Sequence, residues 1–213
     1  MAKRMVVFGY SITYGNWDVE GGWVYRLRKY LDKKFLDSKS LDEWQIYNLG
    51  ISAQTVDQLL ERLDDEAKRR IRRKGDIIFI SIDTNDAIWI KSKKRFKSGP
   101  EVFKKAITQI VKKSKKYPSE IIVVGPTPVD EFKTMPLSFS PDEYIENKIL
   151  DKINNISKSV CKTEGAEFID LYQEFNKEGY KKLLIDGLHP NTNGHELIYK
   201  IVRKFLEEKK FIK

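Results

Sequence analysis

Apolar residues in this chain fall into five short runs, separated by longer stretches in which apolar positions recur with helical spacing. The short runs predict strands at residues 5–8, 43–49, 76–82, 120–124 and 166–171. Residues 77–82 and 121–124 are apolar at almost every position. Continuous apolar runs of this length are typical of strands that are buried on both faces of a parallel sheet.

The stretches between these runs predict helices at residues 23–35, 55–73, 100–117, 142–164 and 191–209. Leu59, Leu63 and Ala67 illustrate the spacing, because they fall on one helix face. Gly99-Pro100 and Ser140-Pro141 each place a permitted N-cap residue before a proline, which the first turn of a helix accepts. The alternation of strands and helices predicts a three-layer α/β/α fold with a five-stranded parallel sheet, in one domain over residues 1–213.

Composition narrows the class of protein. Hydrophobic residues make up 40% of the 213 residues, and no apolar run approaches the roughly 20 residues that span a bilayer. The absence of a signal-peptide pattern and the single cysteine, Cys161, predict a cytoplasmic protein without an internal disulfide. Cys161 lies in a helical pattern, which favours a buried apolar role over a nucleophilic one.

The net charge of +9 raises the hypothesis of a nucleic-acid partner. The basic residues are dispersed, however, and 31 acidic residues accompany them. The densest basic run, residues 68–74, precedes Gly75 at an expected helix end, where positive charge complements the helix dipole. We therefore expect no nucleic-acid partner.

Polar residues that could take part in catalysis follow the predicted strands. Ser11 follows the first strand, Asn85 follows the third, and Asp186 and His189 follow the fifth through a short connection. Residues after parallel strands share one edge of the sheet, where open α/β folds place their binding crevice. A serine becomes a nucleophile when a histidine held by a carboxylate removes its proton. The other histidine, His195, is expected to cap or pack the start of the last helix.

These residues stand in a familiar order. The chain resembles the SGNH hydrolases, also called the GDSL-type esterase/lipase family, over nearly its whole length, and the family's four blocks resemble residues 9–15, 48–55, 83–86 and 186–190. The resemblance implies a flavodoxin-like SGNH hydrolase fold and a serine esterase that uses Ser11, His189 and Asp186 as a triad. It also implies an oxyanion hole made by the N–H groups of Ser11 and Ala53 and by the Asn85 amide. We expect no metal and no cofactor.

Three positions depart from the family pattern. Tyr10 stands where the family usually has aspartate, and Ala53 and Asp83 stand where it usually has glycine. Alanine still supplies an N–H, provided that its backbone angles suit the position. A carboxylate at Asp83 would oppose negative charge in an oxyanion hole unless it faces away or pairs with a lysine.

The substrate is less defined. Ile88 and Trp89 are candidates for an apolar substrate wall, with core packing as an equal alternative, and the basic residues 91–97 form either a solvated loop or a region that attracts anions. Residues 130–139, with Phe132 and Met135, are interpreted as a mobile cover that contacts substrate.

Several functions fit this sequence. The leading hypothesis is hydrolysis of a small or lipid-like acyl or acetyl ester. A carbohydrate O-deacetylase, a non-catalytic binding module and a flavodoxin-like nucleotide binder are the alternatives. The nucleotide binder is disfavoured because Gly-x-Gly-x-x-Gly does not follow the first strand. The substrate is expected to be a small-molecule ester, and the oligomeric state stays open.

Overall fold

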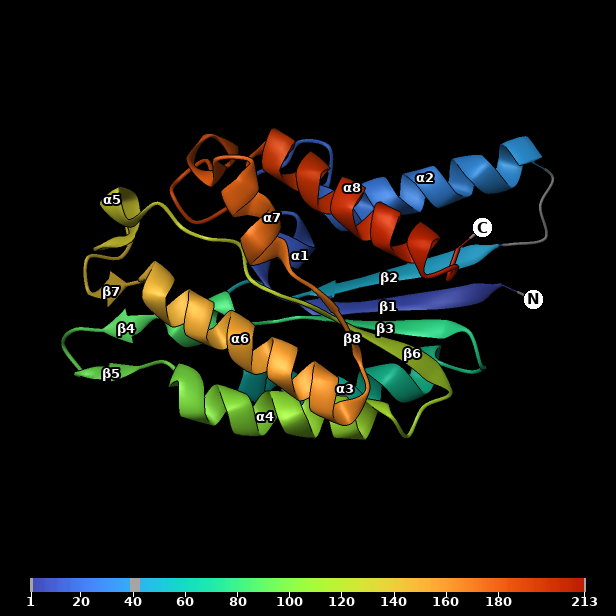
Figure 1. Ribbon diagram of the computed structural model, residues 1–213, viewed down its shortest axis with the longest axis horizontal. Coiled ribbons are helices and arrows are strands. Elements are labelled where there is room, and N and C mark those ends of the chain that lie inside the picture. The colour runs from blue at the N-terminus through green and yellow to red at the C-terminus, as the bar shows by residue number, and fades with distance from the viewer. Residues whose placement is uncertain (1, 39–42, 213) are drawn as a thin grey trace.

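The computed structural model describes residues 2–38 and 43–212, and its centre is a five-stranded parallel sheet (Figure 1). The strands are β1 (Lys3–Gly9), β2 (Trp44–Gly50), β3 (Asp76–Ser81), β6 (Ser119–Val124) and β8 (Glu167–Ile169), in the order β2-β1-β3-β6-β8. The predicted five-stranded parallel sheet is therefore confirmed.

Five long helices cover the two faces of the sheet. Helices α2 (Gly22–Ser38) and α8 (Thr192–Glu208) pack together on one face. Helices α3 (Val56–Arg70), α4 (Gly99–Ser114) and α6 (Asn147–Glu164) lie on the other (Figure 1). This arrangement gives the predicted three layers. The shorter α7 (Leu171–Lys177) follows β8.

The core is built on the two central strands. Met5 to Phe8 of β1 and Ile77 to Ile80 of β3 have no exposed surface, because helices cover both faces of these strands. Each such side chain contributes about 1.5–3 kcal/mol when it is buried. Trp23 of α2 is 1% exposed and packs at 6.1 Å from Phe79 of β3. The continuous apolar runs in the sequence thus reflect burial on both sides.

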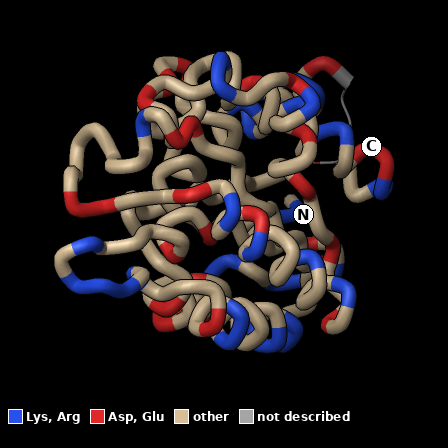
Figure 2. Tube along the Cα trace, turned by 60° about the vertical axis from the view of Figure 1, so that its left-hand side comes forward, with Lys and Arg blue, Asp and Glu red and all other residues tan. Residues whose placement is uncertain are grey.

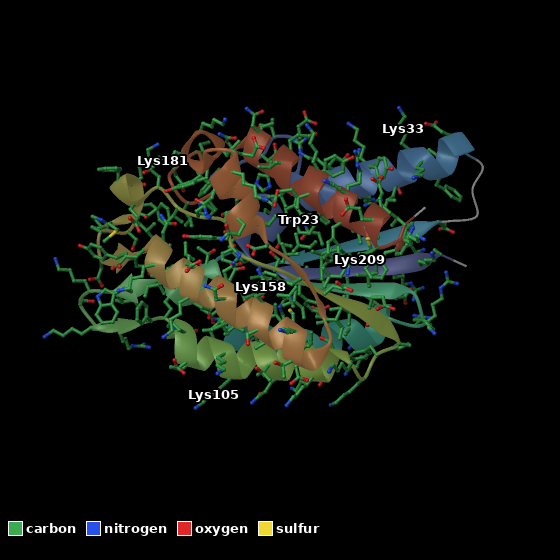
Figure 3. The ribbon with its side chains drawn as sticks, viewed as in Figure 1. Trp23, Lys33, Lys105, Lys158, Lys181 and Lys209 are labelled. Carbon is green, nitrogen blue, oxygen red and sulfur yellow. The ribbon has the colours of Figure 1, made fainter. Side chains whose placement is uncertain are left out.

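Charged side chains surround this core. Lys33 and Lys105 are exposed on α2 and α4, whereas Trp23 lies inside (Figure 3). Basic and acidic residues are both spread over the helices and loops (Figure 2). Within residues 2–38 and 43–212, no helix is long and apolar enough to cross a membrane. Cys161 is 2% exposed, and burial raises the pKa of its thiol to about 12, which confirms its role as a buried apolar residue.

The sequence interpretation was wrong at residues 142–146, because α6 begins at Asn147. The Ser140-Pro141 pair does not start a helix. Residues Glu143–Tyr144 instead form β7, which pairs antiparallel with β4 (Trp89–Ile90), and β4 pairs with β5 (Arg95–Phe96). The backbone groups that an earlier helix start would use are committed to this small sheet, since Lys91 N–H donates to the Asp142 carbonyl.

Helix ends are otherwise close to their predicted positions. The Gly99-Pro100 signal is confirmed, because α4 begins at Gly99. Helix α3 ends at Arg70, three residues before the predicted end, because the backbone becomes extended at the buried Ile71. Lys68, Arg69 and Arg70 occupy the last turn of α3, where their charge favours the helix dipole.

Asp76 fastens the start of β3. Its carboxylate has no exposed surface and accepts hydrogen bonds from the backbone N–H groups of Arg4 (2.9 Å), Arg72 (2.9 Å) and Arg73 (3.2 Å). We predict that Asp76→Ala lowers the free energy of unfolding in urea by about 2–4 kcal/mol, because buried donors lose their acceptor. Asp76→Asn, which keeps one oxygen, should lose less. A loss below about 0.5 kcal/mol for the alanine variant would contradict this account.

Candidate active site

Ser11 lies at the carboxyl end of β1, in a turn that only glycine permits. Strand β1 ends at Gly9, Tyr10 is the N-cap, and Ser11 begins the short helix α1 (Ser11–Tyr14). A Cβ on Gly9 would lie 2.0 Å from Thr13 Oγ1 and 2.7 Å from the Ser81 carbonyl oxygen. As the first residue of α1, Ser11 has a backbone N–H that no intrahelical bond engages.

Ser11, His189 and Asp186 form a continuous hydrogen-bonded chain. Ser11 Oγ lies 3.0 Å from His189 Nε2, and His189 Nδ1 lies 2.8 Å from Asp186 Oδ2. The other carboxylate oxygen accepts hydrogen bonds from the backbone N–H groups of Leu188 (2.9 Å) and His189 (2.7 Å). Gly187, with φ 91°, allows the chain to fold back. The structure therefore brings together the three residues predicted for the triad.

The electrostatics of Asp186 suit a charged partner for histidine. Burial raises the pKa of Asp186, but the hydrogen bonds from the His189 side chain and backbone outweigh it and leave the pKa below the ordinary value. The carboxylate therefore stays ionised near neutral pH. A negative charge at this position fixes the tautomer that carries its proton on Nδ1 and leaves Nε2 free to accept one.

The predicted oxyanion donors come from three neighbouring turns. Asn85 lies in the short 3₁₀ helix η1 (Thr84–Ala87) after β3, and its Nδ2 donates to the Gln54 carbonyl at 3.0 Å. An amide nitrogen carries two hydrogens, so one remains available. Ala53 is exposed and adopts φ 62°, the left-handed conformation that costs a residue with a Cβ roughly 1–2 kcal/mol. Ala53 thus adopts an angle that glycine would reach without this cost.

Tyr10 and Asp83, two departures from the family pattern, contact each other. The Tyr10 hydroxyl donates to Asp83 Oδ1 at 2.8 Å, and that oxygen also accepts from the Thr84 N–H (2.6 Å) and hydroxyl (2.8 Å). Burial raises the pKa of Asp83 to about 6, against the opposing effect of these bonds. Burial and the charge of Asp83 also raise the pKa of Tyr10 well above its usual value. The Asp83 carboxylate is therefore hydrogen-bonded by neutral donors, none of which is a lysine.

Asp86 is a buried carboxylate for which the sequence suggested no role. It has no exposed surface, and its two oxygens lie 3.1 and 3.3 Å from the N–H of Val56, the first residue of α3. Burial raises the pKa of Asp86 to about 7. The contact fastens the Asn85 turn to the loop that carries Ala53. Its detection requires knowing that these two loops are neighbours.

Two aromatic side chains lie beside the His189 ring. The Trp17 ring is perpendicular to it with centroids 4.1 Å apart, and the Phe139 ring lies at 6.3 Å. Their side chains are 53% and 57% exposed. Trp17 adopts φ 60°, in a loop held by the buried Asp18, whose carboxylate accepts from Gly22 N–H at 3.0 Å. Sequence analysis missed Trp17, for which the only signal was an aromatic residue shortly after the serine.

The predicted substrate-binding residues divide into two groups. Ile88 is 2% exposed and belongs to the core, and Trp89 packs on Phe96 at 5.0 Å within the small sheet. Burial favours the alternative of core packing for Ile88, whereas the half-buried Trp89 lies outside the core and stays a candidate for contact with substrate. Phe132 and Met135 are exposed, at 92% and 42%. They stay candidates for contact with substrate.

The predicted cover at residues 130–139 is attached to the histidine turn. It contains the short helix α5 (Glu131–Thr134), and the Asp130 N–H donates to the Gly187 carbonyl at 2.8 Å. Thr134 and Leu137 are buried, so part of the segment packs into the protein interior. Phe139 brings its far end near His189. The segment thus lies beside the site, and its mobility stays a prediction.

His195 is separate from this chemistry. It has no exposed surface and lies in the first turns of α8, as predicted. Burial lowers the pKa of His195 to about 4, so it is neutral near pH 7. Among the described residues, no group of three or more His, Cys, Asp or Glu side chains could hold a metal ion.

A serine, a histidine and an aspartate joined by hydrogen bonds at the carboxyl edge of a parallel sheet are the arrangement that serine hydrolases use. The chain belongs to the GDSL-like lipase/acylhydrolase family, which it matches over residues 7–197. It is therefore a hydrolase of ester bonds.

Individual proteins resemble the chain over most of its length. The chain is 25% identical over 207 residues to the uncharacterized protein YpmR of Bacillus subtilis, covering 94% of this chain and 80% of that protein. A lipase/acylhydrolase from Enterococcus faecalis has the same fold, with a TM-score of 0.72, 20% identity and coverage of 97% and 96% of the two chains. A catalytic mutant of an acetylxylan esterase from Geobacillus stearothermophilus has a TM-score of 0.74, 19% identity and coverage of 97% and 93%.

The raised pKa of Asp86 predicts a measurable dependence of stability on pH. Because its pKa is about 7 in the folded protein against 3.8 ordinarily, the folded state binds the proton more tightly, and this contribution grows as the pH falls from 8 to 5. We predict that the free energy of unfolding of the wild type, minus that of Asp86→Asn, rises by about 1–3 kcal/mol over this range. Urea titrations at both pH values measure it, and a difference that is constant or falls would contradict it.

Proposed function

We propose that this protein is a serine esterase in which Ser11, His189 and Asp186 act as a catalytic triad. The hydrogen-bonded chain from Ser11 Oγ through the imidazole to Asp186 carries the proposal. His189 Nε2 removes the proton from Ser11, and Ser11 Oγ attacks the ester carbonyl carbon. Asp186 stabilises the imidazolium that forms. His189 then protonates the leaving alcohol, and a water activated by the same residue hydrolyses the acyl-enzyme.

The oxyanion of the tetrahedral intermediate is proposed to bind the N–H groups of Ser11 and Ala53 and the Asn85 amide. The position of Ser11 at the start of α1 and the left-handed conformation of Ala53 support this assignment. Donors fixed in place before the reaction stabilise charge that develops only in the transition state. Removal of one such donor typically lowers kcat by about 10²–10³-fold.

Ser11→Ala tests the proposal most directly. We predict that it lowers kcat for p-nitrophenyl acetate by about 10⁴-fold or more, because the nucleophile is lost. It should also abolish labelling by a fluorophosphonate probe. Ser159→Ala, on an exposed position of α6, is the matched control and should retain both.

Two outcomes would reject the triad. Full activity of Ser11→Ala would remove Ser11 as the nucleophile. A wild-type protein that neither turns over esters nor reacts with the probe would favour the non-catalytic binding module that shares this fold.

Trp17 and Phe139 favour a carbohydrate O-deacetylase as the second candidate over a lipid or thioester hydrolase. In the proposed mechanism the leaving alcohol receives its proton from His189, so it occupies the space beside that ring. Both aromatic side chains lie next to His189 and are more than half exposed. Exposed aromatic faces of this kind bury the flat apolar face of a sugar ring favourably. The alcohol is therefore proposed to be a sugar and the acyl group to be acetyl.

Trp17→Ala distinguishes the substrate classes. We predict that it lowers kcat/KM for an acetylated xylo-oligosaccharide by about 10-fold, equivalent to about 1.4 kcal/mol, while p-nitrophenyl acetate changes less than about 3-fold. Tyr25→Ala, which removes an aromatic ring on α2 that is 51% exposed and was not assigned to the substrate site, is the control. An equal loss on both substrates would show that Trp17 supports His189 and not the alcohol.

The physiological substrate is proposed to be a small-molecule ester in the cytoplasm. The free, buried Cys161 supports this location, because proteins without disulfides are typical of a reducing compartment.

A further inference from the structure

We propose that Tyr10 and Asp83 form a buried positioning pair that holds the Ser11 and Asn85 turns in the relative position required for binding an oxyanion. Neither side chain is proposed to touch substrate. The inference rests on the proposed function, because it concerns the geometry of the donors assigned there.

The two residues connect neighbouring strands just beyond the end of their pairing. Gly9 of β1 pairs with Ser81 of β3, and the backbones continue from there into separate turns. Tyr10 and Asp83 are 3% and 1% exposed, and their 2.8 Å hydrogen bond crosses between these turns. The Tyr10 hydroxyl also lies 2.9 Å from Thr84 Oγ1. The contact therefore continues the connection between β1 and β3 after the sheet has ended.

Each member of the pair controls the start of a turn that carries an oxyanion donor. Tyr10 is the N-cap of α1 and directly precedes Ser11. Asp83 is the N-cap of η1, accepts the Thr84 N–H, and stands two residues before Asn85. A displacement of either side chain is passed to the backbone of its own turn. The hydrogen bond thus fixes the distance between the Ser11 N–H and the Asn85 amide.

Stability alone does not account for such a pair. A buried carboxylate is costly, and well-packed apolar residues of similar volume are often as stable or more so. The raised pKa of Asp83 reports this cost. What a charged hydrogen bond supplies beyond apolar packing is a defined direction and length. Orientation of the two turns is the property that this bond adds.

Loss of the orientation should reduce kcat more than it changes KM. The oxyanion donors bind charge that exists in the transition state and not in the ground-state ester. Misplacement by about 1 Å can lower a rate by about 10²-fold. We predict that Tyr10→Phe, which keeps the ring and removes the hydroxyl, lowers kcat for p-nitrophenyl acetate by about 10–100-fold and changes KM less than about 3-fold.

Variants at Asp83 separate the hydrogen bond from the charge. Asp83→Asn keeps an oxygen that accepts from Tyr10 and Thr84, so it should retain most of the wild-type kcat. Asp83→Leu should lose at least as much as Tyr10→Phe, because it also removes the acceptor of the Thr84 N–H. The double variant Tyr10→Phe/Asp83→Leu should be no worse than Asp83→Leu alone, because that variant already removes the bond to Tyr10.

A tyrosine–aspartate pair elsewhere in the chain supplies the matched control. Tyr117, between α4 and β6, donates from its hydroxyl to Asp64 Oδ1 of α3 at 3.1 Å. Tyr117→Phe removes the same chemical group far along the chain from the candidate site. It should leave kcat unchanged.

The inhibition constant of an alkylboronic acid is a measurement that would not change if the Tyr10–Asp83 pair had a purely structural role. The acid forms a tetrahedral adduct on the serine and so resembles the intermediate. In Tyr10→Phe its inhibition constant should rise by the same factor as kcat falls. All assays are made well below the thermal midpoint of each variant, so that a lower kcat reflects loss of orientation and not partial unfolding.

The outcomes distinguish this inference from the proposed function. If Ser11→Ala is inactive while folded Tyr10→Phe and Asp83→Leu keep kcat within about 3-fold, the positioning pair is rejected and the triad stands. If both variants lose activity but boronic-acid inhibition is unchanged, the pair supports folding and not the oxyanion hole, which also rejects the inference. If Ser11→Ala is active, the proposed function itself fails.

Discussion

The close approach of backbones around Gly9 is the constraint on which the site depends. Strand β1 is hydrogen-bonded on both sides, and Gly9 pairs with Gly50 of β2 and with Ser81 of β3. All three strands therefore end at one level, and the turns that carry Ser11, Ala53 and Asn85 start side by side. Helix α1 can fold down onto this edge only because no Cβ fills the space above Gly9.

Most of the architecture was predictable because its signals are local. Buried parallel strands are apolar at nearly every position, and the Asp186–His189 turn contains the glycine that lets it fold back. The small sheet was not predictable in this way. Strands of two residues carry no periodicity, and β7 exists because β4, more than fifty positions earlier in the chain, is there to pair with it. Ser140-Pro141 consequently looked like a helix start and is part of a turn.

The candidate site likewise has a part that could be predicted from local sequence and a part that could not. The proposed nucleophile, base and carboxylate could be named from residue type and order, whereas the supporting contacts depend on which loops are neighbours. Tyr10 and Asp83 appeared separately as departures from a family pattern, and their hydrogen bond shows that they belong together. Trp17 was missed because its place beside His189 requires a left-handed backbone in a loop that Asp18 holds.

The bond from Asp130 to Gly187 has a consequence for how substrate binding and base orientation are related. The turn that carries Asp186 and His189 is joined through it to the segment that carries Phe139. A ligand that shifts this segment therefore also shifts the turn that carries His189. By thermodynamic reciprocity, whatever orients His189 also alters the affinity for that ligand. In the proposed mechanism, binding of the alcohol beside Phe139 and orientation of His189 are therefore thermodynamically coupled.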